Sequence, residues 1–186
     1  MGLKDIKVIS IINEKTGEVR QKRTYIDSVF DEDKGLIFFA NKSYVRSFID
    51  APLPEEFTWA EQGKLSRLKH MILKENQFLV YRGSENGVSC IKPLGLKELQ
   101  RIWKVKERQA SNLVRKAKQH GILREVSVDG ITYLAYNPIY GTKGKRITVT
   151  TYMIFQKELK EMLPTWAIEK FARLANDLGP FIKVID

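Results

Sequence analysis

Apolar and polar residues follow different spacings in different parts of this chain, and each spacing predicts a different kind of structure. At the N-terminal end, an apolar run over residues 6–12 and another from Val19 flank a turn at residues 14–17, which predicts a β-hairpin. A second turn at residues 31–35 comes before a further apolar run. The pattern therefore predicts a three-stranded β-meander, which we expect to form an N-terminal extension over residues 1–50.

Two prolines, Pro52 and Pro54, mark a boundary after this extension, and a helical pattern begins behind them. Thr58 and Glu61 have the form of a capping box, and apolar residues at helical spacing predict a helix over residues 59–73. The elements predicted after it are a strand over 77–81, a turn over 84–87, helices over 96–103 and 106–120, and a hairpin of strands 122–128 and 131–136 around Asp129-Gly130. This order of elements is typical of a winged helix-turn-helix, which we predict over residues 55–140.

The last part of the chain, residues 147–186, is predicted to contain a strand over 147–155 and helices over 156–163 and 165–178. The second of these helices has an apolar face that would either pack on its own domain or pair two chains, and of the two the homodimer is slightly favoured. That face consists of Ile168, Phe171, Leu174, Ala175 and Leu178. The predicted fold class is α+β, a winged helix-turn-helix with an N-terminal β-meander and C-terminal helices.

The predicted helix over residues 106–120 has two unlike sides. Ala110, Leu113, Val114 and Ala117 cluster on one side, which is expected to pack on the domain. The opposite side has the side chains that recognise base edges in the major groove, since Arg pairs with guanine and Asn or Gln with adenine. The predicted base-reading residues are Arg108, Gln109, Asn112 and Arg115. The alternative is that this polar side is merely solvated.

Charge supports the nucleic-acid interpretation. The formal net charge is +10, and residues 92–121 hold nine Lys or Arg against two Asp or Glu, so nine minus two, or +7, falls in this stretch. The predicted phosphate contacts are Lys104, Lys106, Lys116 and Lys118, with Arg124, Lys143, Lys145 and Arg146 as further candidates. The loop lysines are equally compatible with ordinary solvated surface.

Signals for catalysis are weak. His70 and His120 belong to no metal-binding pattern, so we expect no metal, no cofactor and no enzymatic activity. The single cysteine, Cys90, is expected to be a small buried residue, which suits a reducing compartment. Trp59, Trp103 and Trp166 lie at helical apolar positions and are expected in the core rather than as base-stacking platforms. Since no stretch has the apolar length of a membrane span or a signal peptide, a cytoplasmic protein is expected.

Several segments resemble the RepL-type replication initiators of Gram-positive plasmids and their phage relatives, over about residues 10–155. The matching segments are Ile12-Asn13-Glu14-Lys15-Thr16-Gly17-Glu18-Val19, Leu65-Ser66-Arg67-Leu68, Ile72-Leu73-Lys74-Glu75-Asn76 and Tyr136-Asn137-Pro138. The resemblance rests on the order of motifs and implies binding of a replication origin and recruitment of host replication proteins, without catalysis.

Three functions remain open from the sequence. The first is sequence-specific binding of double-stranded DNA at a plasmid or phage replication origin. The second is a transcriptional regulator that uses the same fold on an operator. The third is a protein-interaction module whose basic face contacts an acidic protein.

Overall fold

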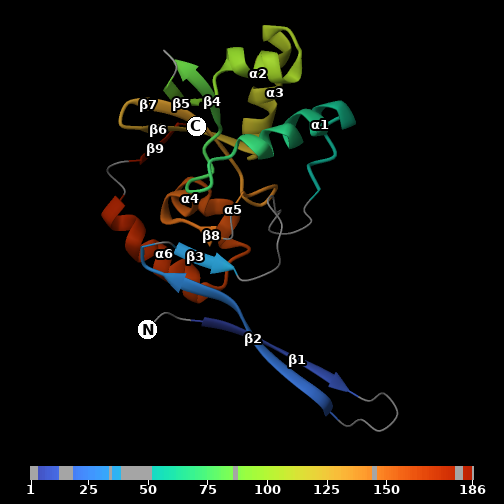
Figure 1. Ribbon diagram of the computed structural model, residues 1–186, viewed down its shortest axis with the longest axis vertical. Coiled ribbons are helices and arrows are strands. Elements are labelled where there is room, and N and C mark those ends of the chain that lie inside the picture. The colour runs from blue at the N-terminus through green and yellow to red at the C-terminus, as the bar shows by residue number, and fades with distance from the viewer. Residues whose placement is uncertain are drawn as a thin grey trace.

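A computed structural model describes residues 4–12, 19–33, 35–38, 52–85, 88–143, 146–178 and 182–185. The fold is α+β, as predicted from the sequence. Helices α2 (Leu96–Trp103) and α3 (Glu107–Gln119) lie at one end of the molecule, the C-terminal helices lie in the middle, and a long ribbon of two strands projects from the other end (Figure 1).

The N-terminal meander is confirmed. Strands β1 (Lys4–Ile12), β2 (Val19–Asp31) and β3 (Gly35–Phe38) pair antiparallel in sequence order, while the first turn lies outside the described residues. A short strand from the C-terminal part, β8 (Arg146–Ile147), pairs with β3 and makes a four-stranded sheet. The meander is thus joined to the C-terminal part by backbone hydrogen bonds.

Helix α1 (Trp59–Leu68) begins with the predicted capping box. The Thr58 side chain accepts a hydrogen bond from the Glu61 amide, and the Glu61 carboxylate accepts one from the Thr58 amide at 2.9 Å. The helix ends earlier than predicted, since its last turn is a 3₁₀ helix over Lys69–Met71 and Ile72 is extended.

The next segment contains one more strand than predicted. Strand β4 (Val80–Glu85) pairs with β5 (Val88–Pro93), a strand that the sequence pattern did not predict. The predicted strand over 77–81 is shifted, with only isolated bridges from Phe78 to Ala135 and from Leu79 to Ile72 before β4 begins. Of the predicted turn, residues 84 and 85 belong to β4, and residues 86 and 87 lie outside the described residues.

Helices α2 (Leu96–Trp103) and α3 (Glu107–Gln119) agree with the prediction, and so does the hairpin of β6 (Leu123–Val128) and β7 (Ile131–Tyr136). Asp129 and Gly130 both have positive φ, 51° and 77°, as a type I′ turn requires. This turn matches the right-handed twist of the two strands, which explains why the dipeptide predicts the hairpin so well.

The predicted strand over residues 147–155 is wrong. Only β8 is a strand there, and α4 (Val149–Ile154) follows because Thr148 caps a helix by accepting a hydrogen bond from the Thr151 amide. The run of β-branched residues had suggested a strand, but this local cap and the burial of Val149 and Tyr152 favour the helix.

Helix α5 (Gln156–Lys160) is shorter than predicted, whereas α6 (Thr165–Leu178) has the predicted bounds. Strand β9 (Ile182–Ile185) was not predicted. It pairs antiparallel with β6, so the hairpin becomes part of a three-stranded sheet in the order β7-β6-β9. A strand of four residues after a helix gives too short an apolar pattern to be recognised from the sequence.

Two hydrophobic cores lie on opposite faces of this sheet. The first, which we call the helical core, is formed around α1, α2 and α3 by Phe57, Leu65, Leu68, Ile72, Leu79, Leu94, Leu99, Trp103, Ala110, Leu113, Ala117, Ile122, Leu123 and Tyr136. The second, which we call the mixed core, is formed by Phe30, Leu36, Phe78, Val80, Val126, Ala135, Ile147, Val149, Tyr152, Ile154, Phe155, Leu159, Leu163, Ala167 and Phe171. Successive residues of β7 point to different cores, since Ala135 belongs to the mixed core and Tyr136 to the helical core.

Candidate nucleic-acid interface

Helix α3 is fixed at both ends and along one side. Ala110, Leu113 and Ala117 are buried in the helical core, as the sequence predicted. At the C-terminal end the Gly121 amide donates to the Lys118 carbonyl at 3.0 Å and the Ile122 amide donates to the Ala117 carbonyl at 2.9 Å. These two bonds form a Schellman motif, which needs the positive φ of Gly121, 65° here.

The opposite side of α3 is exposed. Arg108, Gln109, Asn112 and Arg115 are all solvent-accessible, and no described part of the chain covers them. Arg115 donates from Nη2 to Oδ1 of Asn112 at 3.2 Å, so these two predicted base readers hold each other in the unbound protein. The side-chain oxygen of Gln109 accepts a hydrogen bond from the Lys106 backbone amide at 3.3 Å. The side-chain nitrogen of Gln109 takes no part in that bond. The structure therefore brings the four residues to one helix surface.

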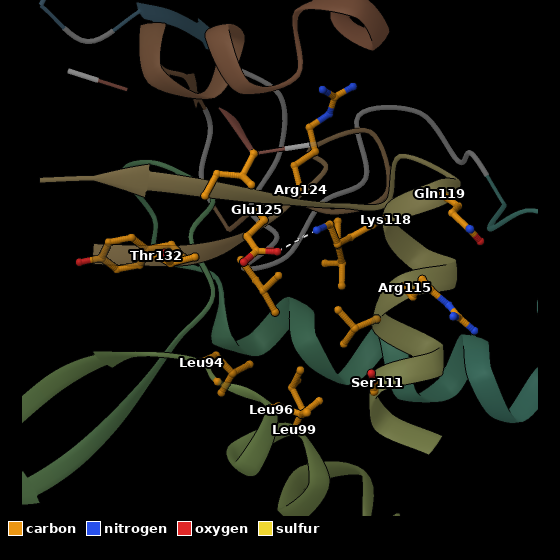
Figure 2. Close-up of a pocket in the computed structure, with 16 residues that line it drawn as sticks. Leu94, Leu96, Leu99, Ser111, Arg115, Lys118, Gln119, Arg124, Glu125 and Thr132 are labelled. Carbon is orange, nitrogen blue, oxygen red and sulfur yellow. Dashed lines mark hydrogen bonds and ion pairs between the residues drawn. The ribbon is translucent and has the colours of Figure 1, made fainter. Parts of the chain in front are cut away.

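The hairpin lies beside α3, and a groove of about 730 Å³ separates them (Figure 2). The groove is lined by the start of α2, one side of α3, neighbouring parts of β6 and β7, and Ile185 of β9. Its apolar lining includes Leu94, Leu96, Leu99, Val114, Leu123 and Leu134. Lys118 reaches across from α3 to Glu125 on β6, with Nζ 2.7 Å from Oε2 (Figure 2). This ion pair joins the helix to the hairpin.

The structure divides the predicted phosphate contacts into two groups. Lys104 and Lys106 are exposed near the start of α3. Lys118 is held by Glu125, and Lys116 is held more extensively: its Nζ lies 2.9 Å from Oε2 of Glu61, 2.6 Å from the Glu56 carbonyl and 4.5 Å from the centre of the Phe57 ring. Lys116 therefore joins α3 to α1, a structural use that the sequence pattern did not reveal.

The remaining basic candidates are dispersed. Arg124 pairs with Glu158 of α5 at 2.8 Å, on the face of the sheet that points away from α3 (Figure 2). Lys143 donates to the His70 carbonyl at 3.0 Å, and Arg146 lies in β8, paired with Ile37 of β3. Lys145 lies outside the described residues. These residues are not gathered beside the exposed side of α3, so Lys104 and Lys106 are the phosphate candidates that the geometry supports best.

Glu61 connects the capping of α1 to the position of α3. Partial burial alone would raise the pKa of its carboxyl, but hydrogen bonds from Lys116 and from Thr58 outweigh this and lower the pKa below its usual value. The carboxylate thus stays ionised at neutral pH, where it both caps one helix and pairs with the other.

Trp59 contradicts the prediction that all three tryptophans are in the core. Trp103 is buried and donates from its indole nitrogen to the Lys64 carbonyl at 2.8 Å, and Trp166 is half-buried against the mixed core. Trp59, by contrast, is 88% exposed at the first position of α1. Helical spacing could not distinguish it, because the apolar side of α1 is carried by Leu65 and Leu68 alone.

Other expectations concern partners and chemistry. Of the predicted apolar face of α6, Phe171 is fully buried in the mixed core, and Ile168, Leu174 and Ala175 are partly buried against it. The homodimer through this helix stays a prediction. Cys90 is half-buried and unpaired. Within the described ranges, His, Cys, Asp and Glu side chains form no cluster suited to a metal ion, and none of the helices there has the length and apolarity to cross a bilayer.

Comparison with protein-family models, with curated proteins and with solved structures finds no match for this chain. Any functional conclusion therefore rests on the residues and geometry given above.

Proposed function

We propose that this chain is a winged helix-turn-helix protein that binds double-stranded DNA by sequence, with α3 as the recognition helix and the β6–β7 hairpin as the wing. The observation that carries the proposal is the exposed side of α3, where two arginines, an asparagine and a glutamine lie together on a helix anchored by its other side. The major groove of B-DNA is wide enough to admit an α-helix, and these side chains match the donors and acceptors of base edges there.

Within this proposal, the N-terminal half of α3 reads the bases. Arg108 and Asn112 lie one turn apart, and Arg115 continues the same side. The Arg115–Asn112 hydrogen bond is replaced on binding, since both side chains then find partners on the bases. Lys104 and Lys106 flank the start of the helix and neutralise phosphates.

Selection of bound fragments from random duplex DNA tests the proposal. We expect enrichment of a defined sequence and a steep loss of affinity with salt. On the selected site, Arg108→Ala or Asn112→Ala is expected to cost roughly 1 to 3 kcal/mol and to relax specificity, whereas Lys104→Ala weakens selected and random DNA alike. Lys157→Ala, an exposed lysine on α5, is the control. Failure to enrich any sequence, or equal losses for Arg108→Ala on both kinds of DNA, would contradict it.

We further propose that the bound site is a plasmid or phage replication origin, on the basis of the resemblance to RepL-type initiators, and that the protein acts without catalysis. A footprint within an origin or its repeats supports this role. A footprint that overlaps a promoter instead supports the alternative, a transcriptional regulator acting on an operator.

A further inference from the structure

The outward side of α2 is basic. Lys97 and Arg101 are four residues apart in this helix and therefore lie on the same side of it, and Lys104 follows in the turn that leads to α3. These three are the exposed residues of the segment 96–104, whereas Leu99 and Trp103 are buried in the helical core. We call the three residues the basic surface of α2. The helix itself lies beside α3 at one end of the molecule (Figure 1).

The charges of this basic surface are not used within the described part of the chain. No ion pair or hydrogen bond there involves the three side chains. Glu98, the acidic residue of α2, accepts a hydrogen bond from the Gly95 amide at 3.2 Å and so caps the start of the helix. Lys116 and Lys118 of α3 differ in this respect, because each is held in an ion pair. The three cations of the basic surface are therefore available to an anionic ligand.

Lys104 has a backbone conformation that disfavours a lysine. It ends α2 with φ 53° and ψ 49°, in the left-handed region that glycine adopts without strain. Its amide donates a hydrogen bond to the Gln100 carbonyl, so this conformation is part of the turn between the two helices. Backbone strain of this kind is concentrated at functional sites. A lysine where glycine would form the more stable turn therefore indicates a use for its charge.

The basic surface is continuous with the side of α3 that we propose reads bases. Lys104 and Lys106 are two residues apart in the turn, and Arg108 is exposed in the first turn of α3. A helix in the major groove lies between two sugar-phosphate strands. From this we infer that α2 is a second DNA-binding element, in which Lys97, Arg101 and Lys104 contact phosphates of the strand that borders the groove entered by α3.

The composition of this surface favours phosphates over a protein partner. Its exposed residues are all cations, which suit a polyanion. A contact with another protein needs buried apolar or aromatic anchors, and the exposed residues of the segment 96–104 include none. The inference rests on the proposed function, since it concerns the same duplex, and it extends the contact from α3 to the whole length of α2.

The salt dependence of binding to the selected duplex tests the inference. Each phosphate contact adds about 0.9 to the slope of log Kobs against log salt concentration, so the triple variant Lys97→Gln/Arg101→Gln/Lys104→Gln is expected to reduce the slope by about 2.7. It should weaken the binding of selected and random duplexes alike. Glutamine is chosen because it suits a helix about as well as lysine or arginine.

The matched control removes three charges elsewhere. The triple variant Lys74→Gln/Lys157→Gln/Lys160→Gln lowers the net charge equally, at exposed lysines outside α2 and α3, and is expected to leave the slope unchanged. A wild-type chain that binds duplex DNA, but whose slope falls no more in the first triple variant than in the control, overturns the role of α2 alone. A wild-type chain that binds no duplex DNA overturns both this inference and the proposed function.

Lys104→Gly separates the charge of this residue from its backbone strain. We expect the variant to raise the midpoint of thermal unfolding, because glycine relaxes the left-handed position. The same variant should bind DNA more weakly, with a slope reduced by about 0.9, whereas Lys104→Arg should keep the wild-type slope. A more stable Lys104→Gly protein that binds DNA as wild type does would show that Lys104 contacts no phosphate, and the inference would be wrong.

Discussion

The helical core and the mixed core lie against opposite faces of the same hairpin, but they draw on the chain in different ways. Every side chain of the helical core comes from residues 57–136, whereas the mixed core joins Phe30 and Leu36 to residues as distant as Phe171. The ring of Phe171 stacks on Tyr152 with centroids 4.6 Å apart and meets Phe30 edge-on at 4.8 Å. One core is thus formed within a continuous segment, and the other holds the two ends of the chain together.

The largest expected effect tests whether the two cores unfold as one unit. Phe171→Ala removes a fully buried ring and is expected to lower the free energy of unfolding by roughly 3 to 5 kcal/mol. Because both cores share β6 and β7, we expect a single transition in which tryptophan fluorescence, sensitive to Trp103 in the helical core, and circular dichroism shift together. Two separate transitions in urea would show that the helical core is stable alone. Arg173→Ala, exposed on the same helix, is the control and should change stability by less than about 0.5 kcal/mol.

The same difference explains how much the sequence predicts. The helical core follows from local signals: the Thr58 capping box, Gly121 behind α3, and the Asp129-Gly130 turn each specify a feature through neighbouring residues, and the structure confirms all three. The mixed core depends on pairings between distant segments, such as β3 with β8 and β6 with β9, which no local pattern specifies. The errors at residues 147–155 and 182–185 fall in this part of the chain, whereas the shifted strand over 77–81 and the unpredicted strand β5 fall within residues 57–136.

In the candidate site too, features set by local pattern were predicted correctly, whereas contacts with residues distant in sequence were not. The helical wheel of α3 correctly separated its buried side, Ala110, Leu113 and Ala117, from its exposed polar side. The basic residues were harder to assign, because an ion pair depends on a partner distant in sequence. Lys116 meets Glu61 of α1, and the sequence shows only that both residues are charged. Exposure of Trp59 was missed for the same reason, since burial depends on what packs against a helix.

Gly121 lies where the two cores meet, and its replacement tests that junction. Gly121→Ala is expected to destabilise the protein by roughly 1 to 2 kcal/mol, because an L-residue at φ 65° is strained. A Cβ there would also come within 3.0 Å of Oε1 of Glu158, on the mixed-core side. Gly63→Ala, in open space within α1, should instead stabilise by roughly 0.5 to 1 kcal/mol. Thermal unfolding of the two variants should therefore shift in opposite directions, and a stabilising Gly121→Ala would contradict the left-handed cap.

Glu61 allows the helical core to be perturbed by pH alone. Glu61→Gln keeps an acceptor for the Thr58 amide but loses the ion pair with Lys116, so we expect a loss of about 1 kcal/mol at neutral pH. The folded pKa lies below the usual 4.5, so this contribution is present above 4.5 and disappears as the pH falls through the folded pKa. Urea titrations at pH 7 and near pH 3 should show a smaller difference between wild type and variant at the lower pH. A difference that persists unchanged at the lower pH would mean that the charge of Glu61 is not its cause.

The smallest expected effects concern two ion pairs made by adjacent residues of β6, one facing each core. Arg124 pairs with Glu158 toward the mixed core, and Glu125 pairs with Lys118 toward α3. Double-mutant cycles should give coupling energies of roughly 0.2 to 1 kcal/mol for each pair, with the larger value for Arg124–Glu158, whose side chains are 24% and 21% exposed against 27% and 35% for Lys118–Glu125. The more exposed pair is also the one beside the proposed DNA surface. Added salt should therefore weaken the coupling of Lys118 with Glu125 more than that of Arg124 with Glu158, and the reverse order would mean that exposure does not set the strength of these contacts.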